Sequence, residues 1–235
     1  MPMNRLLETL ERIDKKGYKA YKDIQGSYTG GWFKLHIDHV QGDPFAAPSR
    51  IRVFIGKEKS RLHPDWYGTP YRKTALEDFF AREIAARIRQ RGNMSRGSGK
   101  SGQIFVDEPG QEVLLRTAVK VDGGELEIRL SVGLPARGRT ILGQEAKKLL
   151  SEEIPGIVEA GVFHYSQERL KQHLELADQQ HAIRRFLEEK GYIAFIANGS
   201  ILPRESGVSN RPLRNKGQVI PFQSPPSLEI EFPVP

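Results

Sequence analysis

The stretch QEVLLRTAVKVDGGELEIRLSVGL, residues 111–134, decides the fold class of this chain. Two strand-like runs flank the sequence Asp122-Gly123-Gly124. A tight hairpin turn needs residues with positive φ, and glycine adopts such angles without a steric penalty. The stretch therefore predicts two antiparallel strands joined by a turn at these glycines.

On either side of this hairpin, helical and strand-like runs follow one another without an internal repeat. Residues 73–91 place Leu76, Phe80 and Ile84 on one stripe of a helix, whereas residues 32–40 alternate as a half-buried strand does. We therefore expect an α+β fold with a mixed, mainly antiparallel sheet packed with helices and one long helix in the C-terminal half. The other expected helices are 4–16, 138–150 and 167–190, and the other expected strands are 51–55, 192–197 and 227–235.

The composition is that of a globular protein of the reducing cytoplasm. The chain has 235 residues, 38% of them hydrophobic, and no cysteine. The absence of cysteine excludes disulfides, thiolate metal sites and a cysteine nucleophile. No apolar run approaches the ~20 residues of a membrane span, and the first residues have no signal-peptide pattern. We expect a cytoplasmic protein without a membrane partner.

Positive charge is concentrated in one segment. The chain carries a net charge of +7, and residues 50–100 hold thirteen Lys or Arg against five acids. A local surplus of this kind attracts polyanions and accelerates their encounter. The segment predicts a nucleic-acid or nucleotide partner, and the alternative is a solvated basic surface. The phosphate contacts expected from it include Arg50, Arg52, Arg82 and Arg89.

The stretch MSRGSGKSGQ, residues 94–103, has the letters of a phosphate-binding loop but not its arrangement. The P-loop sequence G-x-x-x-x-G-K-[ST] requires glycine where Met94 stands, and it lies between a strand and a helix. Here a predicted helix precedes the stretch and a strand follows it, so we reject the P-loop assignment. Backbone amides near glycines still suit phosphate, and the alternative is a plain connector. The expected contacts are Arg96, Gly97, Ser98, Gly99, Lys100 and Ser101.

Other candidate chemistry is weaker. On a strand, His36 and Asp38 share one face while His39 takes the other, which favours hydrogen-bonded side chains over a metal site. We expect neither a catalytic residue nor a metal ligand in this chain. The loop LPRESGVSNRPLRNKG, residues 202–217, is rich in donors that suit phosphate or sugar, or is a flexible surface loop. Its expected contacts are Arg204, Ser206 and Arg211.

Several long stretches resemble one family, the predicted ATPases of the ABC class, in their N-terminal domain. These stretches are KGYKAYKDIQGSY (16–28), HIDHVQGDPFAAPSR (36–50), GSGKSGQIFVDEPGQEVL (97–114), LPARGRTILG (134–143) and FIANGSILPRESGVSNRPL (195–213). In the family, an FQSP-like segment, here residues 222–225, precedes a strand and a genuine P-loop. The resemblance therefore implies an N-terminal domain over 1–235, with lobes of about 1–135 and 136–235, that ends before the ATPase core.

Three functions remain open from the sequence. The resemblance implies an RNA-associated role, which agrees with the basic segment and predicts a module for structured or double-stranded RNA. The alternatives are a lobe that senses nucleotide held by the ATPase core and a domain that only assembles homodimers. ATP and Mg²⁺ are implied for the full-length protein, whereas no cofactor and no ATP hydrolysis are expected of this chain.

Overall fold

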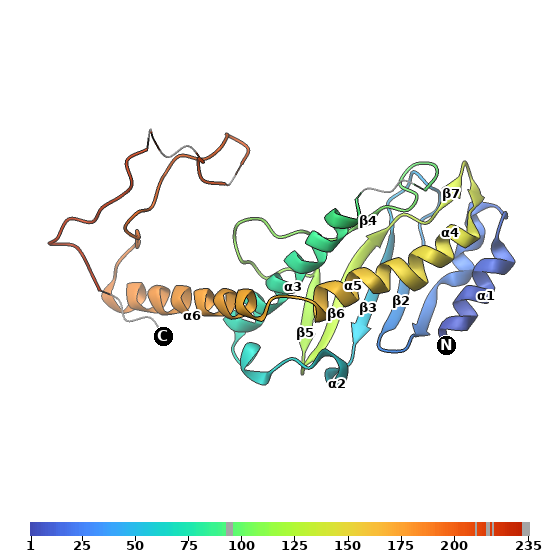
Figure 1. Ribbon diagram of the computed structural model, residues 1–235, viewed down its shortest axis with the longest axis horizontal. Coiled ribbons are helices and arrows are strands. Elements are labelled where there is room, and N and C mark those ends of the chain that lie inside the picture. Colours follow the sequence, from blue (N-terminus) through green and yellow to red (C-terminus); the bar gives the residue numbers. More distant parts are fainter. Residues whose placement is uncertain (93–95, 210, 215–216, 218, 232–235) are drawn as a thin grey trace.

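A computed structural model describes residues 1–92, 96–209, 211–214, 217 and 219–231 (Figure 1). Its architecture is α+β, with an antiparallel sheet that packs against helices, as the sequence predicts. Met94 and Ser95, at the start of the glycine-rich stretch, lie outside the described residues.

Six strands form the main sheet, and every pairing in it is antiparallel. The order is β1-β2-β3-β6, and β4 and β5 both pair with β6, along its last and its first residues respectively. The expected hairpin joins β5 to β6, and Gly123 and Gly124 have φ of +55° and +92°. The strands are β1 (Gly26–Thr29), β2 (Lys34–His39), β3 (Ser49–Ile55), β4 (Ile104–Phe105), β5 (Val119–Asp122) and β6 (Glu125–Val132).

Helices cover one face of this sheet (Figure 1). The central pair is α3 (Pro70–Arg91) and α5 (Ile154–Phe163). They approach closely at Gly161, where an added Cβ would lie 2.7 Å from the Ile84 side chain. The other helical elements are α1 (Met3–Ile13), η1 (Tyr18–Ile24), α2 (Lys57–Ser60), η2 (Pro64–Trp66), α4 (Gly143–Lys148), the π-helical turn η3 (Leu149–Glu153) and α6 (Gln167–Lys190).

The core lies between the sheet and these helices. Ile51, Val53 and Ile55 alternate along β3 and are buried, and the predicted stripe of α3 meets them with Leu76 and Phe80 fully buried. Burial of this apolar surface is the main stabilising contribution to the fold. The same alternation turns every second residue of β3 and β6 toward the opposite face of the sheet.

Helix α6 is capped at its start by Ser166, whose Oγ accepts a hydrogen bond from the Arg169 amide, and at its end by Gly191 in the left-handed conformation. Its first turns pack on α3 through Leu170 and Leu174, which are buried. Ion pairs reinforce this contact, including Arg169 with Glu83 at 2.9 Å. Other α3–α6 pairs are Arg72 with Asp178 and Asp78 with His173.

The strands expected at 192–197 and 227–235 are wrong over their described residues. The chain after α6 runs away from the sheet without regular structure (Figure 1). Only Tyr192 of this apolar run contacts a helix among the described residues, through the Phe186 ring of α6, and Ile193 is fully exposed. Within the described residues, no helix combines the length and apolarity needed to cross a bilayer.

Candidate nucleic-acid interface

The side chains that point away from α3 and α5 form the open face of the sheet. They come from four neighbouring strands and stand beside one another across the ladder, as the pairings of Arg52 with His36 and with Arg129 show. Most are half-buried or exposed and polar. The open face comprises Ser27, Lys34, His36, Asp38, Arg50, Arg52, Phe54, Glu127, Arg129 and Ser131.

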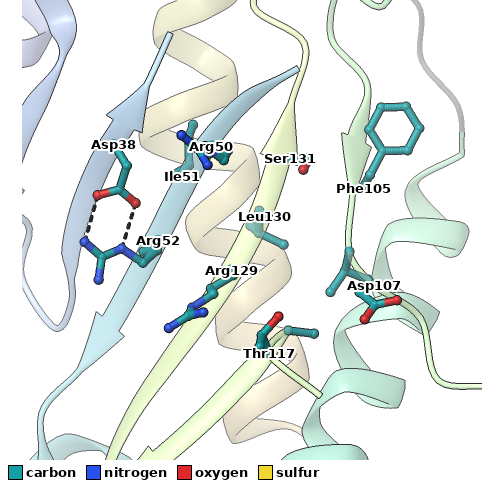
Figure 2. Close-up of a pocket in the computed structure, with 12 residues that line it drawn as sticks. Asp38, Arg50, Ile51, Arg52, Phe105, Asp107, Thr117, Arg129, Leu130 and Ser131 are labelled. Atoms are coloured by element: carbon teal, nitrogen blue, oxygen red, sulfur yellow. Dashed lines mark hydrogen bonds and ion pairs between the residues drawn. The ribbon is translucent and has the colours of Figure 1, made fainter. Parts of the chain in front are cut away.

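Ion pairs run across this face from β2 to β6. Arg52 donates from Nε and Nη2 to the two carboxylate oxygens of Asp38, both at 2.7 Å (Figure 2). Glu127 Oε1 lies 3.5 Å from Arg52 Nη1 and accepts from Arg129 Nε at 2.7 Å. The hydrogen bonds from Arg52 hold the pKa of Asp38 below its usual value. The ion pairs therefore fix the guanidinium groups of Arg52 and Arg129 in orientation.

Arg50 is a cation of this face with unused donors. It is exposed and makes no hydrogen bond or ion pair with a residue that the structure describes. It borders a hollow of about 650 Å³ whose lining also includes Arg129, Ser131 and Phe105 (Figure 2). Guanidinium and hydroxyl groups are the side-chain donors that proteins use most toward phosphate and sugar. Two carboxylates also line the hollow, Asp38, which is paired with Arg52, and Asp107, so the three arginines leave it a net positive charge that suits an anionic ligand.

A second hollow, of about 390 Å³, lies on the same face beside Phe54. The ring of His36 packs against that of Phe54, with 4.6 Å between centroids, and Arg52 Cζ lies 5.1 Å from the Phe54 centroid. Burial and the nearby Arg52 lower the pKa of His36, so the ring is neutral at neutral pH. Lys34 lines the hollow together with these rings. The arrangement offers flat rings next to cations, which is what a nucleobase and its phosphate require.

Three of the predicted phosphate contacts are occupied elsewhere by carboxylates. Arg82 pairs with Asp78 at 2.6 Å on α3, and Arg89 pairs with Glu108. The side chain of Arg96 is only 9% exposed and lies between two glutamates, Glu145 and Glu153. The structure therefore places only Arg50 and Arg52 of the predicted arginines on the open face. Phosphate contact by any of them stays a prediction.

The glycine-rich loop uses its donors inside the protein. The amides of Ser98 and Lys100 donate to the carbonyls of Ala136 and Pro44, at 2.8 and 3.0 Å. Ser101 is fully buried, and its hydroxyl bonds to Ser98 and Ala136. Gly97 and Gly99 each approach a neighbouring backbone so closely that an added Cβ would clash. The loop thus has a packing role whether or not it also contacts phosphate.

The C-terminal candidates lie on a separate part of the molecule. Arg204 and Pro212 form an isolated bridge, and the amide of Glu205 donates to the carbonyl of Arg211 at 2.9 Å. Ser206 belongs to the same irregular hairpin, which follows α6 and lies away from the sheet (Figure 1). The structure therefore does not bring these candidates together with Arg50 and Arg52.

Sequence reasoning did not assign a binding role to Phe54, His36, Arg129 or Phe105. The signal that could have found them is the strand alternation itself, because Arg50, Arg52 and Phe54 share the non-core phase of β3. As expected from that phase, His36 and Asp38 share a face, and each is satisfied by a hydrogen bond. In the described part of the chain, no cluster of three or more side chains is arranged to hold a metal ion.

Comparison with known families gives the class of this protein. Residues 3–165 match the family model described as the N-terminal part of the ATPases of the ABC class, and residues 166–235 match the model of the ABC ATPase P-loop domain. Since the first match covers more than half of the chain, the chain belongs to the ATPases of the ABC class. The two matches meet at the first residues of α6. A search of curated proteins found none that matches the chain.

The expectation that the chain lacks the ATPase core is not confirmed, because the P-loop domain model matches residues 166–235. The sequence Gly99-Lys100-Ser101 is the only Gly-Lys-[ST] of the chain, and it precedes that match. Its surroundings do not fit the phosphates of ATP, since α3 precedes it, β4 follows it and its amides donate to carbonyls. The division into lobes near residue 135 stays a prediction.

Proposed function

We propose that this ATPase of the ABC class binds RNA across the open face of its sheet, in the cytoplasm. The observation that carries the proposal is the uncovered sheet face on which arginines and rings border two hollows. Arg50 and Arg129 are positioned for backbone phosphates, and the pair of Phe54 and His36 for a base.

The rings favour nucleic acid over other polyanions. An inorganic or protein-borne phosphate needs only cations, whereas a base gains about 1–3 kcal/mol from stacking on an aromatic side chain. Phe54 and His36 stand on the open face next to Arg52, and Phe105 is 40% exposed at the far side of the first hollow. Along β3 two guanidinium groups, Arg50 and Arg52, stand beside one ring, Phe54, so a base and the neighbouring phosphates could be bound together.

The same rings select a form of RNA. Bases in a duplex are stacked on each other, so their faces are unavailable to protein rings, whereas loops and bulges present them. We therefore infer that the ligand is a structured RNA with an unpaired segment, and that a continuous duplex binds more weakly. This narrows the expectation of structured or double-stranded RNA.

Fluorescence anisotropy with labelled hairpin RNA, duplex RNA and duplex DNA at two salt concentrations tests the proposal. We expect Arg50→Ala/Arg129→Ala to weaken hairpin binding at least tenfold and to flatten its salt dependence. The control Lys171→Ala/Arg184→Ala removes the same charge from α6 and should change the affinity less than twofold. Equal weakening by both double variants would show nonspecific attraction, and no RNA binding by the wild type would end the proposal.

A further inference from the structure

A small hairpin at one end of the molecule presents two exposed arginines. Strands β7 (Ala136–Arg137) and β8 (Thr140–Ile141) form the hairpin, and Gly138 turns it with φ of +58°. Arg137 and Arg139 are exposed, and neither side chain makes a hydrogen bond or ion pair with a described residue. This distinguishes them from the arginines of α3 such as Arg82, which pair with carboxylates.

Three lysines lie beside this hairpin. The amide of Lys15 donates to the carbonyl of Ile141 at 3.1 Å, and the amide of Ile141 donates to the carbonyl of Lys16 at 2.9 Å. Lys15, Lys16 and Lys19 are exposed and, like the two arginines, have no side-chain partner among the described residues. The basic cluster is defined as Lys15, Lys16, Lys19, Arg137 and Arg139.

The backbone under the basic cluster is held from two sides. Tyr21 donates its hydroxyl to the carbonyl of Pro135 at 2.6 Å, and burial raises the pKa of this tyrosine, so that it stays a donor. From the other side, the Ser98 amide donates to the Ala136 carbonyl, and Ser98 Oγ accepts from the Gly138 amide, both at 2.8 Å. Because this backbone is already held in place, little of its conformational freedom is lost when a ligand binds, which favours affinity.

The acids at this end are already engaged. Asp14 accepts a hydrogen bond from the Gly143 amide at 2.6 Å, and Asp43 accepts from the amides of Phe45 and Ala46. Asp23, on η1 with Lys19, is likewise engaged, because it pairs with Arg12 at 3.0 Å. The basic cluster therefore keeps a surplus of positive charge that no ion pair with the described residues neutralises.

We propose that the basic cluster is a binding site for closely spaced phosphate groups. Arginine binds phosphate oxygens with two parallel hydrogen bonds, and lysines add charge without demanding a fixed geometry. Such phosphates have two sources, the polyphosphate of a nucleotide and the backbone of RNA. The site is separate from the open face, so it does not depend on the RNA proposal.

The experiment measures the affinity of the wild-type chain and of the double variant Arg137→Ala/Arg139→Ala for two ligands. Sodium tripolyphosphate, followed by calorimetry, represents the nucleotide source, and labelled hairpin RNA, followed by anisotropy, represents the backbone source. We expect the double variant to weaken at least one of them tenfold or more, with its melting temperature unchanged. The charge-matched control Lys171→Ala/Arg184→Ala should change neither affinity by more than twofold.

The outcomes separate the sources. Weakened tripolyphosphate binding assigns the site to a polyphosphate, and an RNA salt slope that falls by about 1.4, for two lost contacts with a single strand, assigns it to the backbone. Ser98→Ala should weaken binding of the same ligand less, because it removes the hydrogen bond between Ser98 Oγ and the Gly138 amide but leaves the charge of the basic cluster unchanged. If neither ligand distinguishes the double variant from the control, the site does not exist.

Discussion

Replacing Gly97 by alanine should destabilise the protein strongly, because this glycine touches another part of the backbone. Its φ is +136°, and an added Cβ would lie 1.9 Å from the carbonyl oxygen of Ala136. The obstacle is backbone, so no side chain can turn away to relieve the contact. The backbone angle costs an alanine about 1–3 kcal/mol, and the forced overlap adds about 1–3 kcal/mol. We expect a loss of roughly 3 kcal/mol in the free energy of unfolding.

Urea denaturation and calorimetry measure this loss. For a protein of this size, each kcal/mol lowers the melting temperature by roughly 2–4 °C, so Gly97→Ala should melt about 6–12 °C lower. Gly42→Ala is the control, since Gly42 does not have a positive φ and nothing lies within 4 Å of its Cβ position. Equal melting temperatures for the two variants would refute the packing role of the glycine-rich loop.

Three further changes test other parts of the structure. Glu153→Gln should cost about 3–5 kcal/mol in urea denaturation, because it leaves two nearly buried arginines without their shared carboxylate; a cost under 1 kcal/mol would contradict this. Burial raises the pKa of Asp78, but hydrogen bonds from His173 and Arg82 outweigh it and hold this pKa below 3.8. The carboxylate therefore stabilises the fold above about pH 4 and loses this effect as the pH falls further. In Asp78→Asn the melting temperature should fall less steeply with decreasing pH below about pH 4 than it does in the wild type. Lys100→Ala should change neither RNA nor tripolyphosphate affinity more than twofold, since Lys100 Nζ lies 3.5 Å from a backbone carbonyl in a loop whose donors point inward; a tenfold loss would restore the loop as a phosphate site.

Much of the fold follows from local patterns in the sequence. The alternation over β3, the helical stripe of α3 and the glycines between β5 and β6 each specify an element without reference to the rest of the chain. Helix α6 has the predicted bounds because Gly191 ends it in the left-handed conformation. The apolar run 192–197 shows the limit of this reasoning. Its hydrophobicity predicts burial, but burial needs a partner surface, and nothing in the run specifies one.

Charge is the feature that local patterns describe least well. The thirteen cations of residues 50–100 form one cluster in sequence, but α3 turns Arg82 and Arg89 in different directions, toward carboxylates on its own surface and on another segment. Ion pairing depends on which acids the fold brings near, and Glu108 and Glu153 are distant from their partners in sequence. The sum of charges over a segment therefore overstates the field that a ligand meets.

The glycine-rich loop and the basic cluster illustrate two ways in which glycine and cations combine. In the loop, glycines permit contact between backbones, and the donors are used up in that contact. In the β7–β8 hairpin, Gly138 has open space around its Cβ position, and the cations on either side of it point to solvent. Ser98 of the loop is hydrogen-bonded to Ala136 and Gly138 of the hairpin. A substitution in the loop should therefore change phosphate binding only by moving Arg137 and Arg139. We therefore expect Arg137→Ala/Arg139→Ala to lower the affinity for phosphate more than Ser98→Ala does.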